Sequence, residues 1–598
     1  MRTLNFVRWT LLTTLGCWCS PVAAQVAPGG AQIPPGATPG GALPRLEQAV
    51  PPVPRQGDLF EVPRVYDRPL GLEEGPRIVV KAFKLQGAVD HRKHRVRVAE
   101  AQALLDAARD KQPRQGFSIN QLQQAADKVA AYYREHGYIL AQAFVPEQNV
   151  VDGVVAVQVL EGKLSGVTVE GNKHYPASTL ARPFKALIGQ PLDKDSIEAA
   201  LLTLTNYPGL TAFGVLGAGH DVGTTDLTVK VQSEDRIHLE SVTDNYGTQY
   251  AGKYREQVTL TLDDPLHWAD RLKLTGLYAS SFNGSAHGAY GGADYEIPVF
   301  SPNDSLHLEH LTNAYDVGAG AAGFSTAKST GKSQVDELGY RHDFERTRLS
   351  SASIGVALNV KSATFDAPPT VIYDDKLTTA RLDAQWEGVD TRFRGVDRAA
   401  FSYTHGFNNL LGAIGPYDPN TASNSHVSRL GASGEFNKYT LELQRLQRIT
   451  QYTSLILRVN GQYSKDPLVS LEQFSMGGPD TVRAYSVAEV LAESGGVATA
   501  ELSTGLPGLS GKHAFGNSTW GQVLQFSTFI DYANGRLNAP VSSTQQAITH
   551  LAGAGGSIQF NVPGRLFARL DLASPLTSRK PSDGHWLQYY FRVGTTFF

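Results

Sequence analysis

"SLILRVNGQYS", residues 454–464, decides the fold class of this chain. One face carries Leu455, Leu457, Val459, Gly461 and Tyr463, and the other carries Arg458, Asn460 and Gln462. Because side chains of a β-strand point alternately to opposite faces, this pattern predicts a strand with one apolar and one polar face. A strand between lipid and an aqueous lumen has this pattern, and so does a strand of a soluble β-sandwich.

The same alternation recurs in the second half of the chain, at 258–264, 565–574 and 587–594. Residues 235–598 would hold about 16 antiparallel strands at about 23 residues per strand and loop, an even number typical of bacterial barrels. The chain ends "FRVGTTFF", and the alternation of its last strand is in phase with Phe597 rather than Phe598. These features favour a transmembrane β-barrel over the sandwich.

The amino terminus has the pattern of a secretory signal peptide at 1–24. Arg2 and Arg8 form the basic region, 9–19 is apolar, and small residues precede a cleavage site after Ala24. A lipoprotein signal at Cys17 is the alternative, but it needs Leu or a similar residue where Thr14 stands. The two cysteines, Cys17 and Cys19, would leave with the signal peptide, so we expect no disulfide and no thiolate metal site.

Residues 25–76 are rich in proline and glycine, which predicts an extended linker. Only "RLEQAV" (45–50) could form one helical turn. No run of 18 apolar residues follows, so we expect no membrane-spanning helix.

The sequence pattern changes at residue 77. Residues 77–234 predict two α/β units with the order β-α-α-β-β, 77–161 and 162–234. In the first unit, helices are expected at 97–111 and 118–137, the latter opening with a capping box of Ser118 and Gln121. The second unit repeats the order, which indicates an internal duplication. A three-stranded sheet of this kind would leave an edge strand able to accept another strand.

The sequence contains no complete catalytic or phosphate-binding motif. "GKS" at 331–333 has Thr326 where a phosphate-binding loop needs glycine, and neither H-E-x-x-H nor G-x-S-x-G occurs. The net charge of −3 gives no argument for nucleic acid. We therefore expect no enzyme, no cofactor and no metal site. The basic run "HRKHR" (91–95) is either a contact to lipid phosphates or a partner, or a solvated loop.

Four ordered motifs make residues 77–598 resemble the outer-membrane transporters of two-partner secretion, of the haemolysin and filamentous-haemagglutinin type (the TpsB family). They are "GYILAQAFVPEQN" (137–149), "DNYGTQYAGKYR" (244–255) followed by "LDDPLHWAD" (262–270), "FSMGGPDTVRAY" (474–485) and "FIDYANG" (529–535). The resemblance implies a 16-stranded barrel in the outer membrane of a Gram-negative bacterium, preceded by two periplasmic polypeptide-transport (POTRA) domains, 77–161 and 162–234.

The resemblance also implies function and site residues. The barrel would be a pore that exports a large TpsA-type exoprotein, such as an adhesin or a cytolysin. It would contact outer-membrane lipid, lipopolysaccharide and the barrel-assembly machinery. The linker resembles the family region that plugs the pore with a helix, for which 43–50 is the candidate. A loop inside the lumen would act as a latch through Gly477, Gly478, Arg483, Tyr485 and the wall residue Asp531. In the first POTRA domain, Tyr138, Pro146, Glu147 and Gln148 would bind unfolded cargo.

One departure from the family pattern falls beside the latch arginine, where Ala484 stands in place of the usual glycine. If position 484 needs a positive φ, alanine would be strained there by about 1 kcal/mol or more.

Three other classes compete with this interpretation. A passive porin would not need two α/β domains, an assembly factor for barrel insertion usually has more repeats, and a secreted hydrolase would need a catalytic constellation. We therefore favour the transport pore.

Overall fold

The computed structural model describes most of the chain. The described residues are 12–13, 33–44, 48–49, 60–61, 77–282, 284–317, 329–344, 346–367, 370–420, 426–516, 518–540 and 546–597. The predicted signal peptide and linker lie mostly outside these residues, and so does Phe598.

Sixteen antiparallel strands close into a barrel, which confirms the predicted number. They are β10 (Ile237–Asp244), β11 (Tyr254–Asp263), β12 (Arg271–Ser280), β13 (His287–Pro298), β14 (Asp304–Val317), β15 (Ser329–Asp343), β16 (Ser350–Ala367), β17 (Thr370–Asp390), β18 (Gly395–Gly406), β19 (Phe436–Arg448), β20 (Thr453–Tyr463), β23 (Ser494–Thr504), β24 (Leu524–Arg536), β25 (Ile548–Val562), β26 (Leu566–Pro575) and β27 (Gln588–Thr596). Neighbours in the chain pair with each other, and β27 returns to β10.

The period of two explains why these segments form a barrel wall. In β20, Leu457, Val459 and Tyr463 are exposed on the outer face, where lipid would cover them. Arg458 lies on the other face, 3.8 Å from Glu501 of β23. In β27, Tyr589 and Val593 are exposed in phase with Phe597, as predicted.

The first α/β unit, residues 77–161, has the predicted element order. It consists of β4 (Ala82–Gln86), α2 (Val98–Arg109), α3 (Ile119–Glu135), β5 (Gln142–Phe144) and β6 (Val154–Leu160). Strand β6 is central, parallel to β4 and antiparallel to β5. Helix α3 begins with the predicted capping box of Ser118 and Gln121, and its apolar stripe packs on the sheet.

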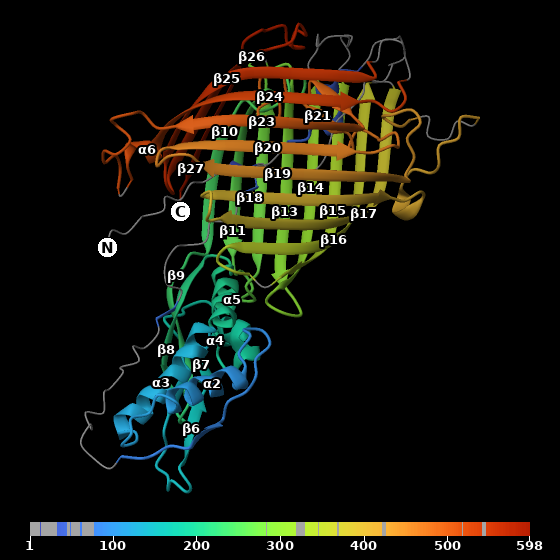
Figure 1. The fold of residues 1–598 in the computed structure, drawn as a ribbon. Helices are drawn as coiled ribbons and strands as arrows, with labels where there is room; N and C mark the ends of the chain where they lie inside the picture. Colours follow the sequence, from blue (N-terminus) through green and yellow to red (C-terminus); the bar gives the residue numbers. More distant parts are fainter. Residues whose placement is uncertain are drawn as a thin grey trace.

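The second unit repeats this order between the first unit and the barrel (Figure 1). It consists of β7 (Lys163–Glu170), α4 (Ala177–Ala181), the 3₁₀ helix η2 (Arg182–Leu187), α5 (Lys194–Thr205), β8 (Leu210–Ala218) and β9 (Thr224–Glu234). Its sheet has a fourth strand, because β3 (Phe60–Glu61) from the linker pairs in parallel with β8. One edge of this sheet is therefore already covered by the chain itself.

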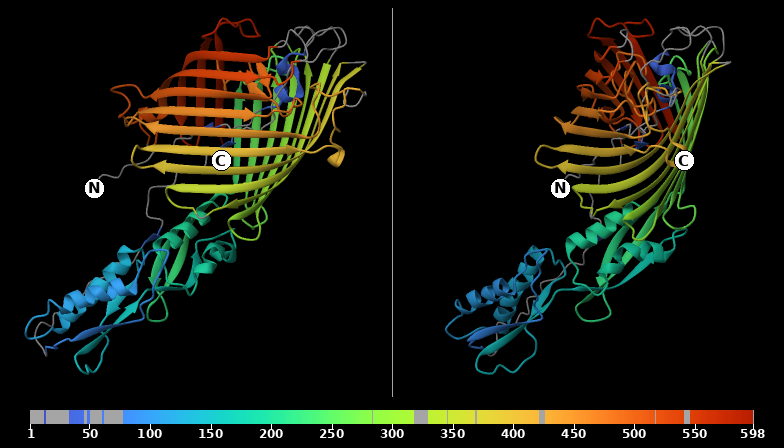
Figure 2. Two further views of the ribbon diagram at one scale, coloured as in Figure 1. Left: turned by 45° about the vertical axis from the view of Figure 1, so that its right-hand side comes forward. Right: turned by 90° about the vertical axis from the view of Figure 1, so that its right-hand side faces the viewer.

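A short segment before the two units lies inside the barrel. Residues 33–44 contain the 3₁₀ helix η1 (Pro35–Ala37) and the single turn α1 (Pro39–Ala42), which both views of Figure 2 show among the barrel strands. Ile33 and Ala37 are buried against wall residues, among them Tyr315 and Phe365. Residues 33–44 therefore occupy part of the lumen.

Of the candidate plug helix at 43–50, the structure describes residues 43–44 and 48–49, and none of these four is helical. The helical turn lies upstream, where Thr38 caps it through its side chain and Pro39 supplies the fixed φ of a first helical residue. Leu43 ends it in an extended conformation. Further along, β2 (Gln48–Ala49) is a strand that pairs with β1 (Leu12–Thr13).

The remaining elements are short and lie in loops. They are η3 (Leu410–Gly412), β21 (Phe474–Met476), β22 (Val490–Ala492) and α6 (Trp520–Val523). Among the described residues, no helix is both long and apolar enough to cross a membrane.

Candidate functional site in the barrel lumen

The loop between β20 and β23, residues 464–493, folds back into the barrel; we call it the inward loop. Its strands β21 and β22 pair with each other. Phe474, Met476 and Val482 are buried against wall residues of β23, β24 and β25. The loop is thus a packed part of the interior.

Arg483 is the centre of the inward loop, and the structure places it against Asp531 of β24, as the family resemblance implies. The Arg483 Nε and Nη2 atoms donate to the two Asp531 carboxylate oxygens at 2.9 and 2.8 Å, and its backbone N–H donates to the same group at 3.1 Å. Such a bidentate bond fixes orientation as well as charge.

Two further carboxylates on the wall face the same guanidinium. Arg483 Nη1 lies 2.7 Å from Glu501 Oε2 and 3.5 Å from Asp571 Oδ1. Arg569 of β26 bridges Glu501 and Asp571 at 3.0 and 2.8 Å. The wall therefore holds three acids, and Arg483 supplies the loop's positive charge to a cluster whose other members belong to the barrel.

The guanidinium also stacks on an aromatic ring. The Arg483 Cζ atom lies 3.3 Å from the centroid of the Phe529 ring on β24. Arginine stacks on rings in this way where lysine cannot. Phe529 and Asp531 are two residues apart on one strand, so they present a ring and a carboxylate from the same face.

Gly477 and Gly478 turn the chain toward the arginine, and both have φ near +104°. The Gly478 N–H donates to the Tyr485 carbonyl at 3.1 Å, and the Gly477 N–H donates to the Thr481 hydroxyl at 2.8 Å. A side chain at 477 would meet the Ser486 carbonyl oxygen at 2.4 Å, so this turn requires glycine twice over.

Tyr485 does not join the arginine cluster. Its ring is fully buried, and its hydroxyl lies 2.6 Å from the Thr577 hydroxyl beyond β26. Its backbone carbonyl accepts from the Tyr590 hydroxyl of β27 at 2.6 Å. Tyr485 therefore attaches the loop to the last two strands, while Arg483 attaches it to β23 and β24.

Ala484 is unstrained. Its φ lies outside the left-handed region, so the expected penalty for alanine is absent. The methyl group instead faces Gly553 of β25, where a β-carbon would lie 2.3 Å from Ala484 Cβ. The wall leaves room for the methyl group.

The base of the inward loop has charged anchors of its own. Glu472 accepts from Lys361 of β16 at 2.7 Å and also pairs with Lys438 of β19. On the other side, Glu493 accepts from Arg429 Nε at 2.8 Å. Arg429 is almost fully buried in the loop that joins β18 to β19. The loop is therefore held at its tip and at both ends.

The sequence reasoning missed Glu501, Asp571, Arg569 and the anchors at the base. A signal for Asp571 and Arg569 was present, since both fall on the inward face of the alternating segment 565–574. No pattern in the sequence says which inward residues share a level of the barrel, because that depends on strand register.

The amino-terminal segment meets the inward loop in the lumen. The Gly36 carbonyl accepts from the Thr248 hydroxyl at 2.9 Å, and the Ala37 carbonyl accepts from the Tyr315 hydroxyl at 2.8 Å. A β-carbon at Gly36 would lie 3.3 Å from the Val487 carbonyl oxygen of the loop. Segment and loop thus fill neighbouring parts of one lumen.

The predicted cargo-binding residues of the first POTRA domain divide into two groups. Pro146, Glu147 and Gln148 follow β5 at the end of the sheet, with Glu147 exposed. The Gln148 side chain bonds both backbone groups of Ala156, at 2.7 and 2.9 Å, so it extends the pairing of β6. Tyr138 lies apart, buried between His91 and His94, where a peptide has no access to its ring.

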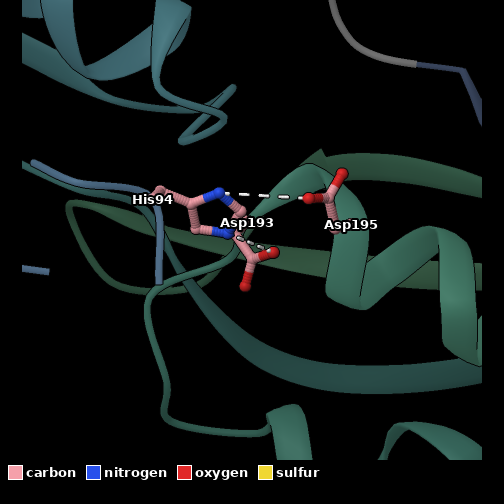
Figure 3. Close-up of side chains that lie close together, drawn as sticks. All are labelled: His94, Asp193 and Asp195. Atoms are coloured by element: carbon pink, nitrogen blue, oxygen red, sulfur yellow. Dashed lines mark hydrogen bonds and ion pairs between the residues drawn. The ribbon is translucent and has the colours of Figure 1, made fainter. Parts of the chain in front are cut away.

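In the "HRKHR" run, Arg92, Lys93 and Arg95 are exposed, while His91 and His94 are half-buried. His94 joins the two α/β units, because it bonds Asp193 of the second unit at 3.0 Å, whereas His91 bonds Glu161 of its own unit at 2.8 Å. Lys93 donates to Ser196 at 2.8 Å. Figure 3 shows His94 between Asp193 and Asp195. The Lys93 ammonium, 3.3 Å from Asp193, already pairs with this carboxylate, so we interpret the group as an interdomain joint.

A closed 16-stranded barrel, two preceding β-α-α-β-β units and a loop pinned inside the lumen define a class. The chain is an outer-membrane β-barrel transporter with POTRA domains in the periplasm.

Comparison with known families is more specific. Residues 223–560 match the family described as "Haemolysin secretion/activation protein ShlB/FhaC/HecB", and residues 80–162 match the "POTRA domain, ShlB-type". The chain belongs to this family of two-partner secretion transporters.

The individual proteins that this chain resembles are also transporters. The chain is 23% identical to the heme/hemopexin transporter protein HuxB of Haemophilus influenzae over 80% of its own length and 81% of that protein. It is 24% identical to the outer membrane transporter CdiB of Escherichia coli, over 72% and 70%. The solved CdiB structure from Escherichia coli has the same fold, with a TM-score of 0.68, 21% identity, and coverage of 91% of this chain and 94% of that one.

Proposed function

We propose that this protein exports one large partner exoprotein across the outer membrane, with the inward loop as the gate and the POTRA domains as the site of cargo capture. The observation that carries the gate is the Arg483 cluster. A buried arginine with three facing carboxylates holds the loop in one position. Removing one member of a buried ion pair costs about 3–5 kcal/mol, because the other charge is left unpaired.

The positive and negative charges of the wall cluster balance only when the loop is in place. Without Arg483, Glu501, Asp531 and Asp571 would face Arg569 and the more distant Arg458. One negative charge would then be uncompensated in a buried site, so the cluster favours the position of the loop described here.

The test of the gate is secretion by Arg483→Ala. Cells that express the transporter with its partner should assemble the barrel normally and secrete little or no partner. The matched control is Arg381→Ala, because Arg381 also pairs with two wall carboxylates, Glu337 and Asp383, at 2.8 and 2.7 Å. Normal secretion by Arg483→Ala would refute the gate.

Cargo capture is the second part of the proposal. It rests on short edge strands in the first POTRA sheet, which could accept an unfolded segment as an added strand. Edge strand β5 has three residues and is followed by Pro146, the exposed Glu147 and Gln148. In the second sheet, by contrast, the linker strand β3 covers the β8 edge.

Deletion of 77–161 should abolish binding of the partner's secretion segment to purified transporter. Glu147→Lys leaves the hydrogen bonds of Gln148 in place and should weaken binding while the domain stays folded. Undiminished binding by both variants would refute capture at this domain without bearing on the gate.

A further inference from the structure

The junction between the first and last barrel strands is the shortest of the sixteen. Strand β10 pairs with β27 over five residue pairs, from Glu240↔Thr596 to Asp244↔Arg592, among the described residues. The pairing of β10 with β11 on its other side runs over eight. This junction, which we call the seam, is the point where the barrel closes.

Strand β27 continues beyond the end of the seam. Its residues Gln588–Phe591 lie past Arg592, the last residue opposite β10. Their backbone groups on the β10 side would be unpaired in the barrel wall. A buried backbone N–H or C=O group without a hydrogen-bond partner is destabilising, so a partner is expected there.

Asn245, the residue after β10, supplies that partner. Its Nδ2 donates to the Tyr589 carbonyl at 2.9 Å, and its Oδ1 accepts from the Phe591 N–H at 2.8 Å. Its own backbone N–H donates to the Phe591 carbonyl at 3.3 Å. One fully buried amide side chain therefore replaces a strand residue on β27.

Neighbouring residues hold Asn245 in position. Asp244 accepts from Arg255 of β11 through both carboxylate oxygens, at 2.7 and 2.8 Å, and lies 3.8 Å from Arg592 of β27. It also accepts from the Tyr246 N–H at 3.0 Å, which turns the chain away from the sheet directly after Asn245. On the outer face, the Tyr254 and Tyr589 hydroxyls lie 3.1 Å apart.

We infer that Asn245 is the clasp that keeps the seam closed at the end of β10 where Asp244 lies, and that Asp244 positions it. An asparagine amide can donate to one backbone group and accept from another at the same time, as a paired strand residue does. The motif "DNYG" at 244–247 then has a function apart from cargo and gate: it completes the pairing that β10 is too short to make.

Hydrogen exchange of the full-length protein in detergent micelles or lipid nanodiscs tests this inference. In Asn245→Ala, the amides of β10 and β27 should exchange about tenfold faster, the effect of losing about 1.4 kcal/mol of hydrogen bonding at the opening end. Strands β12 to β16 should keep their protection. The matched control is Asn313→Ala, another buried asparagine, on β14 and away from the seam.

Two more variants distinguish the loss of the amide hydrogen bonds from the loss of side-chain packing. Asn245→Asp has the same shape but no donor for the Tyr589 carbonyl, so its seam should also exchange faster. A disulfide between S241C and T595C, which are paired across the seam, should restore slow exchange in Asn245→Ala. Wild-type exchange in Asn245→Asp, acceleration spread equally over β12 to β16, or no rescue by the disulfide would each overturn the clasp.

Discussion

Ala484 of the inward loop and Gly553 of β25 fit together as a methyl group against a bare α-carbon. A β-carbon at 553 would lie 2.3 Å from Ala484 Cβ and 3.4 Å from the Ala484 nitrogen. Neither side can give way easily, because one belongs to the barrel wall and the other adjoins the bidentate Arg483.

Gly553→Ala should therefore dislodge the loop tip and reduce secretion, at a cost of about 1–3 kcal/mol for overpacking a filled site. The exchanged pair Ala484→Gly with Gly553→Ala should restore secretion, since it moves the methyl group to the other partner. Secretion assays on the four combinations measure this coupling. Gly276→Ala, where a β-carbon meets nothing within 4 Å, is the control.

A positive charge without the guanidinium should not substitute for Arg483. Arg483→Lys keeps the positive charge but loses the bidentate bond to Asp531 and the stacking on Phe529. We expect secretion well below wild type, though above Arg483→Ala. Secretion equal to wild type would show that the cluster needs only a cation.

Two of the three wall acids, Asp531 and Glu501, should contribute unequally to holding the loop. Asp531 accepts three hydrogen bonds from Arg483, and Glu501 accepts one. Since a hydrogen bond to a charged group contributes about 1.5–3 kcal/mol, Asp531→Asn should impair secretion more than Glu501→Gln. The reverse order would place the main anchor of the loop on β23.

The base anchor can be tested by a double-mutant cycle. Arg429→Met leaves Glu493 buried without its cation and should lower the stability of the barrel in detergent by about 3–5 kcal/mol. The pair Arg429→Met with Glu493→Gln should recover part of this loss. Thermal unfolding followed by gel mobility gives the measurement, and additive single effects would argue against a direct pair.

The interdomain joint should depend on pH through Asp193. Burial alone would raise the pKa of Asp193, but hydrogen bonds from Ser196 and the charge of Lys93 outweigh burial and lower the pKa below its usual value of 3.8. A lowered pKa in the folded state stabilises the joint above pH 3.8, and this contribution is lost as the pH falls below it.

Spin labels at K111C and K173C, both exposed and one in each unit, measure the joint. Their distance distribution should broaden only below about pH 4 in the wild type. In Asp193→Asn it should be broad throughout and lack that transition. A narrow distribution in Asp193→Asn would show that other contacts hold the units together.

The lumen segment should limit ion flow. Gly36→Val would bring a side chain against Tyr250 and the Val487 carbonyl, where even a β-carbon lies at 3.2 and 3.3 Å. We expect it to displace the segment and raise single-channel conductance in planar bilayers. Gly217→Val, in open space on β8, should leave conductance unchanged.

Local patterns made most of the fold predictable. The period of two in segments such as 454–464 depends only on neighbours in the chain, so strands and their outer faces could be predicted, while the number of strands came from the length of 235–598. The capping box at Ser118 and the helices after it follow for the same reason. The lumen segment was misplaced because a turn built on Pro39 and two glycines has no periodic signal.

Contacts between distant residues could not be predicted in this way. The pair of Arg483 and Asp531 was expected from family resemblance, and its partners Glu501 and Asp571 depend on strand register. The basic run at 91–95 showed charge but not its partner, since Asp193 is 100 positions from Lys93. Asn245 stood in a recognised motif, yet its role requires the end of the chain, 346 positions away.

The last strand therefore sets an order of assembly. The Phe591 N–H donates to Asn245 at the edge of β27 that faces β10, and the hydroxyl of Tyr590, the residue before it, donates to the Tyr485 carbonyl in the lumen. Neither bond can form until the final residues of the chain have been delivered to the membrane. Closing the wall and fixing Tyr485 of the inward loop thus both depend on the nine residues of β27, so a chain truncated before β27 would have an open wall and would also lose the Tyr590 contact to the loop.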